Sequence, residues 1–152
     1  MFSQDNGSLS LQEFLPYRLS VLANRMSQSL ATKYQRQFGI SVGEWRIIAV
    51  LGEKLTASAV EITQIIAMDK VAVSRSVKKL IEKQLIKKTT CSSDSRKKLL
   101  EMTDDGHDLY QQLLPIARHH QQLALQNFSE QERQMLVTLI SKLDQSDAVI
   151  GY

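Results

Sequence analysis

Cations and small hydroxyls recur at helical spacing between Asp69 and Glu82. Val73, Val77 and Leu80 share the opposite side at spacings of four and three residues, which predicts an amphipathic helix with Asp69 as its N-cap. On the outward side, arginine and serine can hydrogen-bond base edges, and lysine can neutralise phosphates. The residues placed to do this are Ser74, Arg75, Lys78 and Lys79. An ordinary solvated helix face is the alternative interpretation.

A basic loop follows this helix, between two short apolar runs. Residues 85–90 and 98–102 are rich in apolar and β-branched side chains and predict the two strands of a hairpin. The loop between them is polar and leads into three consecutive cations, which suits contact with a phosphate backbone. Asp94 stands two residues before Arg96, so its carboxylate can orient the planar guanidinium. The contacts predicted for this hairpin are Asp94, Arg96, Lys97 and Lys98.

The positive charge of the chain is concentrated in the same region. Ten Lys or Arg and two acidic residues lie from Lys70 to Lys98, so this segment carries +8, the remainder −5 and the whole chain +3. A basic segment on an acidic body localises a surface for nucleic acid. Because the cations span a helix and a hairpin without a bulky apolar face, a membrane-surface helix is disfavoured. A protein-interaction module whose basic hairpin meets an acidic partner stays open as an alternative.

Two helices are predicted before the basic region. Apolar residues every three or four positions predict a long helix over 16–38, which Gly39 ends. Ser41 and Glu44 have the spacing of a capping box and predict a second helix over 41–54.

A polar connector at 56–59 and a short helix over 60–66 lead into the basic region. The isoleucines predicted to face inward from the short helix are Ile62, Ile65 and Ile66. The order helix, turn, helix, hairpin is the outline of a winged helix-turn-helix, over 41–103.

The chain after the hairpin is predicted to be helical again. Thr103 can act as an N-cap, and Ser129 with Glu132 forms another capping box before a last apolar stripe. The first helix is longer than a small core requires, so 16–38 and 104–146 are predicted to form a dimer interface. The predicted fold class is mainly α with a small β-hairpin wing (α+β), in a single domain over 1–152.

Several short motifs occur in a specific order. They are Phe14-Leu15-Pro16-Tyr17-Arg18-Leu19, Glu44-Trp45-Arg46, Val73-Ser74-Arg75 with Leu80, Asp94-Ser95-Arg96, and Leu99-Leu100-Glu101-Met102-Thr103 with Gly106. Together they resemble the MarR family of bacterial transcription regulators, over roughly residues 14–143. Met102 stands where that family usually has Leu, and Gln84 stands where it often has Gly.

The resemblance implies a homodimeric, sequence-specific regulator that binds double-stranded DNA, most often as a repressor. Two recognition helices about one DNA turn (~34 Å) apart would read a palindromic operator. The resemblance also implies release by a small aromatic or phenolic effector, bound between the dimer helices and the DNA-binding unit. The residues expected to line that ligand site are Tyr17, Arg18, Trp45 and Arg46.

The sequence contains few of the motifs that are typical of catalytic or metal-binding sites. The chain has three histidines and no Gly-rich phosphate loop, HExxH or CxxC spacing, so we predict no enzyme and no metal or cofactor site. Cys91, the one cysteine, lies near Lys87, Lys88 and Lys97, which favour its thiolate. A redox-responsive regulator acting through Cys91 is therefore a further alternative. One cysteine and no apolar run of ~20 residues predict a cytoplasmic protein without a membrane span.

Overall fold

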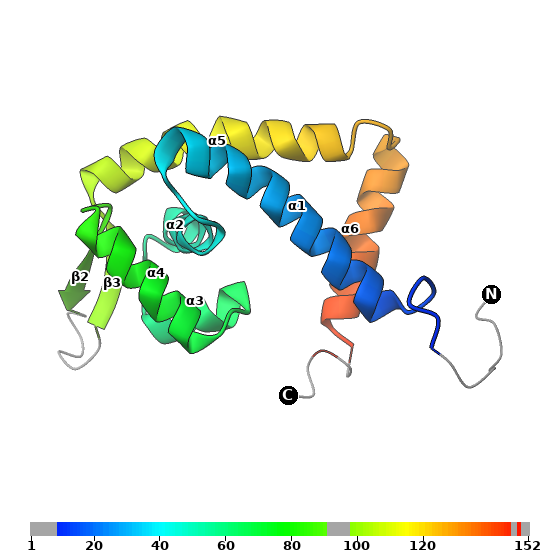
Figure 1. The fold of residues 1–152 in the computed structure, drawn as a ribbon, viewed down its shortest axis with the longest axis horizontal. Coiled ribbons are helices and arrows are strands. Elements are labelled where there is room, and N and C mark those ends of the chain that lie inside the picture. The colour runs from blue at the N-terminus through cyan, green and yellow to red at the C-terminus, as the bar shows by residue number, and fades with distance from the viewer. Residues whose placement is uncertain (1–8, 91–97, 147–148, 150–152) are drawn as a thin grey trace. The chain divides into compact units, whose positions relative to one another are not determined.

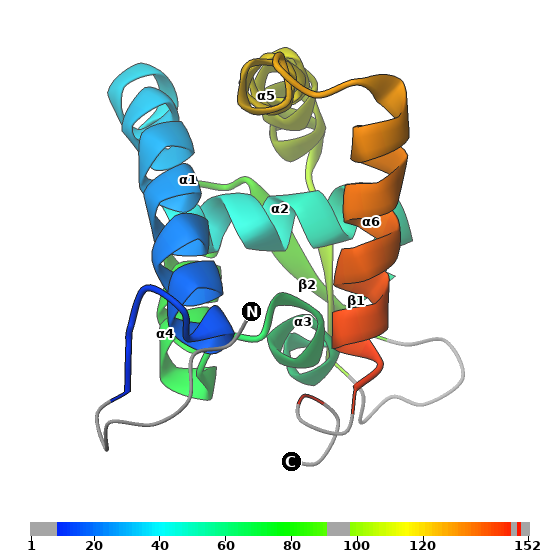
Figure 2. The same ribbon diagram turned by 90° about the vertical axis from the view of Figure 1, so that its right-hand side faces the viewer.

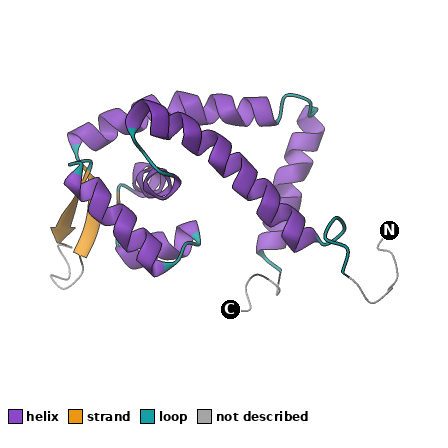
Figure 3. Ribbon diagram, in the orientation of Figure 1, coloured by secondary structure: helices purple, strands orange, loops and turns teal. Residues whose placement is uncertain are grey.

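The computed structural model describes residues 9–90, 98–146 and 149 (Figure 1). The chain forms two compact units, Met1–Leu114 and Pro115–Tyr152. The elements are α1 (Leu15–Phe38), α2 (Val42–Lys54), β1 (Thr56–Ala57), α3 (Ala59–Ile66), α4 (Lys70–Glu82), β2 (Ile86–Thr90), β3 (Lys98–Met102), α5 (Asp104–Ala124) and α6 (Glu130–Asp144). Helices dominate and the strands form one small sheet (Figure 3), which confirms the predicted fold class. None of the helices in the described ranges has the length and hydrophobicity of a transmembrane span.

The first helix has the boundaries that its terminal residues predict. Pro16 lies in the first turn, where its missing N–H costs no hydrogen bond. At the other end, Gly39 has φ +65°, a left-handed conformation that glycine adopts without strain. Its N–H donates to the carbonyl of Gln35 and closes the helix. The helix predicted over 16–38 is confirmed, with Leu15 as its first residue.

Side-chain caps begin most of the following helices. Ser41 accepts from the backbone N–H of Glu44, whose carboxylate accepts from the N–H of Ser41, so the predicted capping box is present. The box predicted at Ser129 is present as well. Asp69 caps α4 through the N–H of Ala72 at 2.9 Å, as predicted.

The short helix α3 turns a narrower face inward than predicted. Ile62 is completely buried, whereas Ile65 is 48% exposed, so its predicted inward position is wrong. The physical reason is geometry, because residues three apart on a helix differ in direction by about 60°, and a helix of two turns buries only a narrow stripe. Ala67 adopts a left-handed conformation that ends α3 and starts the turn into α4.

The sheet contains one strand more than the sequence predicts. The two hairpin strands are confirmed, and β2 pairs antiparallel with β3. Residues 56–59, expected to be a connector, begin with the short strand β1, in which Thr56 pairs with Glu101 and Ala57 with Leu100. The strand order is therefore β1-β3-β2. A two-residue strand exists only through its distant partner, so its local sequence carries no period that would reveal it.

Helix α2 occupies the middle of the first unit and packs against α3, α4 and β3 (Figure 2). Its residues Ile47, Ile48 and Leu51 have no exposed surface. Gly43 allows α4 to come close, because a Cβ at this position would lie 2.6 Å from the Oγ of Ser76. This central helix therefore sets the position of α4.

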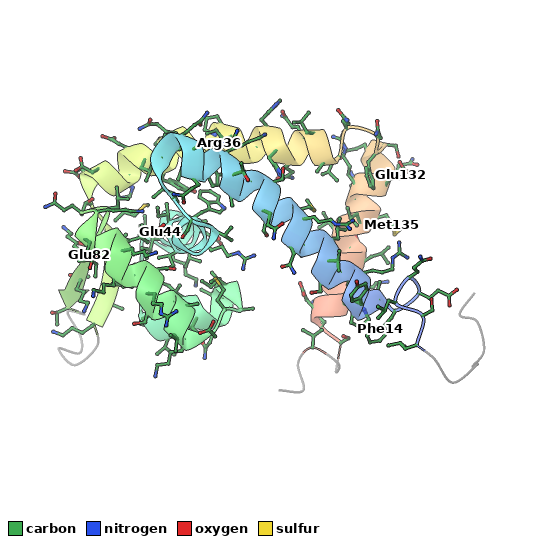
Figure 4. The ribbon with its side chains drawn as sticks, viewed as in Figure 1. Phe14, Arg36, Glu44, Glu82, Glu132 and Met135 are labelled. Atoms are coloured by element: carbon green, nitrogen blue, oxygen red, sulfur yellow. The ribbon has the colours of Figure 1, made fainter. Side chains whose placement is uncertain are left out.

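Helices α5 and α6 differ in burial. The buried residues of α5, Gly106 and Leu113, precede Pro115 and belong to the first unit. A Cβ on Gly106 would collide with the carbonyl oxygen of Leu85, so glycine lets α5 start against the backbone between α4 and β2. Helix α6 has no buried residue. Its exposed apolar side chains include Met135 (labelled in Figure 4), Val137, Leu139, Ile140 and Leu143.

Candidate nucleic-acid interface

Helix α4 presents its basic side chains to solvent. Val73, Val77 and Leu80 are buried, as the apolar stripe predicts. The four predicted DNA contacts of this helix, Ser74, Arg75, Lys78 and Lys79, are all exposed. The Nζ of Lys78 lies 3.8 Å from the Oε1 of Glu82, and both side chains are well exposed. Such a pair contributes roughly 0.5 kcal/mol or less, so it does not prevent Lys78 from reaching a phosphate.

The outward face of α4 also contains an apolar residue that is not among the predicted DNA contacts. Val71 is 58% exposed and lies in the first turn of the helix. It precedes Arg75 by four residues and Lys78 by seven, the spacing of a shared helix face. The exposure of Val71 could have been predicted from the sequence, because this residue falls outside the buried stripe formed by Val73 and Val77.

The hairpin is placed beside α4. Lys98 is exposed at the start of β3, opposite Thr90 of β2. Lys87, on β2, pairs with Glu101 on the neighbouring strand at 3.0 Å. The other predicted hairpin contacts, Asp94, Arg96 and Lys97, lie outside the described residues, as does Cys91.

A groove of about 570 Å³ lies between α3, α4 and the sheet. Its apolar residues include Val73, Val77 and Leu100, all buried. Three of its lining residues are Lys70, Lys88 and Lys98. The structure thus brings cations from α4 and from both hairpin strands around one concave surface, which explains why distant positions contribute to one basic face.

The turn from α4 into the hairpin depends on a left-handed backbone conformation at one residue. Gln84 has φ +58°, in the left-handed region. The N–H of Leu85 donates to the carbonyl of Leu80, and the hydroxyl of Thr103 donates to the carbonyl of Gln84 at 2.7 Å. The MarR family often has a glycine at this position. A glutamine takes up the same conformation, at a cost of roughly 1–2 kcal/mol relative to glycine.

An ion pair between a buried carboxylate on α2 and an exposed lysine joins α2 to the end of α4. The Glu44 side chain is 2% exposed, and its Oε1 lies 2.6 Å from the Nζ of Lys83 at the end of α4. The same Nζ donates to the carbonyl of Gly39 at 2.7 Å. Burial by itself raises the pKa of the Glu44 carboxyl, but hydrogen bonds from Lys83 and Ser41 outweigh it and lower the pKa. Figure 4 labels Glu44 on α2, away from the solvent-facing Glu82.

The four residues predicted to line a ligand site lie along two helices. The Trp45 ring packs against that of Tyr34 of α1, with ring centroids 5.0 Å apart and the ring planes tilted by 52°, and the Nη2 of Arg46 donates to Ser27 at 3.3 Å. Burial raises the pKa of Tyr34 to about 12. Tyr17 and Arg18 are exposed near the start of α1. Tyr17 is ten residues before Ser27, about 15 Å along the helix. The structure therefore brings Trp45 and Arg46 to α1 but does not group all four residues, and the ligand site stays a prediction.

Metal ligands do not gather in the described residues, where no group of three or more His, Cys, Asp or Glu side chains is placed to hold an ion. His107 and His119 are exposed on α5.

Comparison with known proteins decides the family. The MarR family pattern matches residues 38–97. A MarR/EmrR family transcriptional regulator from Acinetobacter sp. ADP1 is 35% identical, with a TM-score of 0.83 over 89% of this chain and 95% of that chain. The chain belongs to the MarR family.

Two further solved structures share the MarR fold. A MarR family regulator from Listeria monocytogenes, crystallised with a 26mer DNA, is 21% identical, with a TM-score of 0.82 over 90% of each chain. BpsR of Bordetella bronchiseptica, described with regulation of its DNA binding by 6-hydroxynicotinic acid, is 20% identical, with a TM-score of 0.80 over 93% of this chain and all of that one.

Membership of the MarR family makes this protein a DNA-binding transcription regulator with a winged helix-turn-helix, as predicted. In MarR terms, α4 is the recognition helix and β2 with β3 form the wing. The two departures from the family pattern keep this geometry. Met102 is buried at 5% exposure, as an apolar residue in this position should be, and Gln84 adopts the left-handed turn.

Proposed function

We propose that this MarR-family protein is a homodimeric, sequence-specific repressor that a small ligand releases from its operator. The observation that supports DNA reading is that Ser74, Arg75, Lys78 and Lys79 are exposed on α4, opposite the buried residues of the same helix. A helix fixed on one side and polar on the other fits the major groove, in which base edges are accessible.

Within this set the roles divide by chemistry. Arg75 and Ser74 contact base edges, because a planar guanidinium matches guanine and a hydroxyl can donate or accept. Lys78 and Lys79 contact phosphates or nearby base edges. The wing contacts the minor groove or the DNA backbone through Lys98, Arg96 and Lys97. Asp94 orients the guanidinium of Arg96.

The dimer is supported by apolar side chains that one chain leaves exposed. Helix α1 exposes Leu15, Leu19, Leu22 and Met26. Helix α6 exposes a further series from Met135 to Leu143. Apolar side chains left exposed in a row along a helix in this way mark a protein interface. Two chains joined through these helices would place two recognition helices on the half-sites of a palindrome.

Release by an effector is supported by the structure of the Bordetella relative, described with 6-hydroxynicotinic acid. In this chain, Trp45 and Arg46 on α2 offer an aromatic face and a cation, with Tyr17 and Arg18 on α1. These groups suit a small aromatic or phenolic ligand.

The test is binding of the purified protein to its own upstream intergenic DNA and to a scrambled duplex, at two salt concentrations. We expect preference for the native duplex with a steep salt dependence, and footprinting then defines the operator. Equal, weak binding to both duplexes would contradict the proposal and favour an acidic protein partner of the basic hairpin.

The variant Arg75→Ala tests the base contact. Loss of one side chain that reads a base should weaken operator binding by about 1–3 kcal/mol and relax specificity at that position. Lys54→Ala removes an exposed cation at the end of α2 and is the matched control, which should bind as the wild type. An equal loss on operator and scrambled DNA for Arg75→Ala would show that Arg75 contacts the backbone and does not read a base.

A further inference from the structure

We propose that Val71 reads a thymine through its methyl group and is a specificity residue of the recognition helix. The inference rests on the proposed function and adds an apolar contact to its polar ones. Val71 is 58% exposed, although its β-branched side chain has no polar group that would favour water.

The direction of Val71 follows from the helix geometry. Successive residues turn by about 100°, so Val71 points within about 40° of Arg75 and about 20° of Lys78. The completely buried Leu80 points about 180° away from it. Val71 therefore lies at the middle of the outward face of α4, among the side chains proposed to contact DNA.

Its position along the helix also suits a base contact. Val71 is the second residue of α4, and residues near the N-terminus of a recognition helix are those that reach base edges. Arg75 follows one turn later, about 6 Å along the axis. That rise corresponds to roughly two base pairs at 3.4 Å each, so the thymine should lie near the base that Arg75 reads.

Thymine is the base whose chemistry matches this side chain. In the major groove it presents a C5-methyl group, and the other three bases present only polar edges or C–H. Covering one methyl with another removes apolar surface from water, which is favourable by roughly fourfold in affinity per group.

A structural role does not account for Val71, because its exposed side chain is not part of the described core. Valine is a weaker helix former than alanine. Val71→Ala should therefore fold at least as well as the wild type, so a change in binding reports the DNA contact.

The experiment replaces each thymine of one operator half-site, one at a time, by uracil, which lacks only the methyl group. We expect one or two of these duplexes to bind the wild type about fourfold more weakly. Val71→Ala, which loses both γ-methyl groups and no longer reaches the base, should bind the thymine and uracil duplexes equally. Val71→Thr, which keeps one γ-methyl group, should retain the preference for thymine.

Val60→Ala is the matched control. Val60 is also the second residue of its helix, α3, and is 62% exposed. This variant should keep the wild-type response to uracil. The proposal is overturned if uracil costs the wild type nothing at any thymine, or costs Val71→Ala as much as the wild type. If the wild type prefers no duplex at all, the proposed function itself fails, and the two failures are thereby distinguished.

Discussion

In the first compact unit, α2 is enclosed by α3, α4 and the sheet, and Ile47, Ile48 and Leu51 have no exposed surface. In the second unit, α6 has an apolar stripe of the same period, but its side chains remain exposed. The two stripes differ in whether the chain itself supplies the covering surface. An amphipathic pattern thus predicts that a face will be covered and does not say by which molecule.

The largest effect should come from a charge on the uncovered face. Ile140 is 47% exposed on α6, so Ile140→Asp should fold but separate the proposed dimer. Losing one of two linked recognition helices should weaken operator binding by roughly 100-fold. Sedimentation velocity and operator titration measure both effects, with Ile140→Val as the control. If Ile140→Asp remains dimeric and binds the operator with full affinity, α6 is not part of the dimer interface.

A core substitution in the first unit should act differently. Leu51→Ala leaves a cavity in a fully buried site and should lower the free energy of unfolding by about 3 kcal/mol. Because the core lies within one chain, the loss should be the same at low and high protein concentration. Leu139→Ala, on the exposed stripe of α6, should instead have an effect that grows with dimer population. Urea unfolding at two protein concentrations measures both effects. If the two variants respond identically, a second chain does not cover the apolar side chains of α6.

The third prediction compares two capping boxes of the same sequence spacing. Glu44 is buried and paired with Lys83, whereas Glu132 of α6 is fully exposed. Glu44→Gln should cost about 2 kcal/mol, since a buried hydrogen bond to a charged group is lost. Glu132→Gln should cost less, because water replaces its interactions. Thermal unfolding measures both, and an equal loss would show that the Lys83 pair adds nothing to the cap.

The same pair predicts a pH dependence. The pKa of Glu44 is lowered below its ordinary value of 4.5, so its contribution to stability is present above pH 4.5 and is lost as the pH falls through the lowered value. Stability of the wild type should therefore fall in this acid range, and Glu44→Gln should flatten that fall. Unfolding curves between pH 3 and pH 6, roughly one unit or more on each side of the ordinary pKa, measure the difference.

Local signals were sufficient wherever a residue interacts with its own neighbours in sequence. Pro16 and Gly39 bounded α1, and Ser41, Asp69 and Ser129 marked helix starts, because a cap bonds to backbone groups within three residues. The buried and exposed faces of α4 were predictable for the same reason. Of the eight predicted DNA contacts, the four on α4 and Lys98 could thus be assigned to one basic surface. The other three, Asp94, Arg96 and Lys97, lie outside the described residues.

Features that depend on distant residues were not predictable. The strand β1 requires Glu101 and Leu100 as partners, and which narrow stripe of α3 is buried depends on its packing against α2 and α4. The pair of Glu44 and Lys83 joins residues 39 positions apart. The sequence around each of these two residues does not indicate the other as its partner.

The helices, their ends, the hairpin and the outward side of α4 could be predicted from the sequence, since they follow from periodicity and short-range hydrogen bonds. The third strand, the pair of Glu44 with Lys83 and the groove that gathers Lys70, Lys88 and Lys98 exist only in the folded chain. The physical reason is that these features arise from packing between segments far apart in the chain, and a one-dimensional pattern contains no distance between such segments.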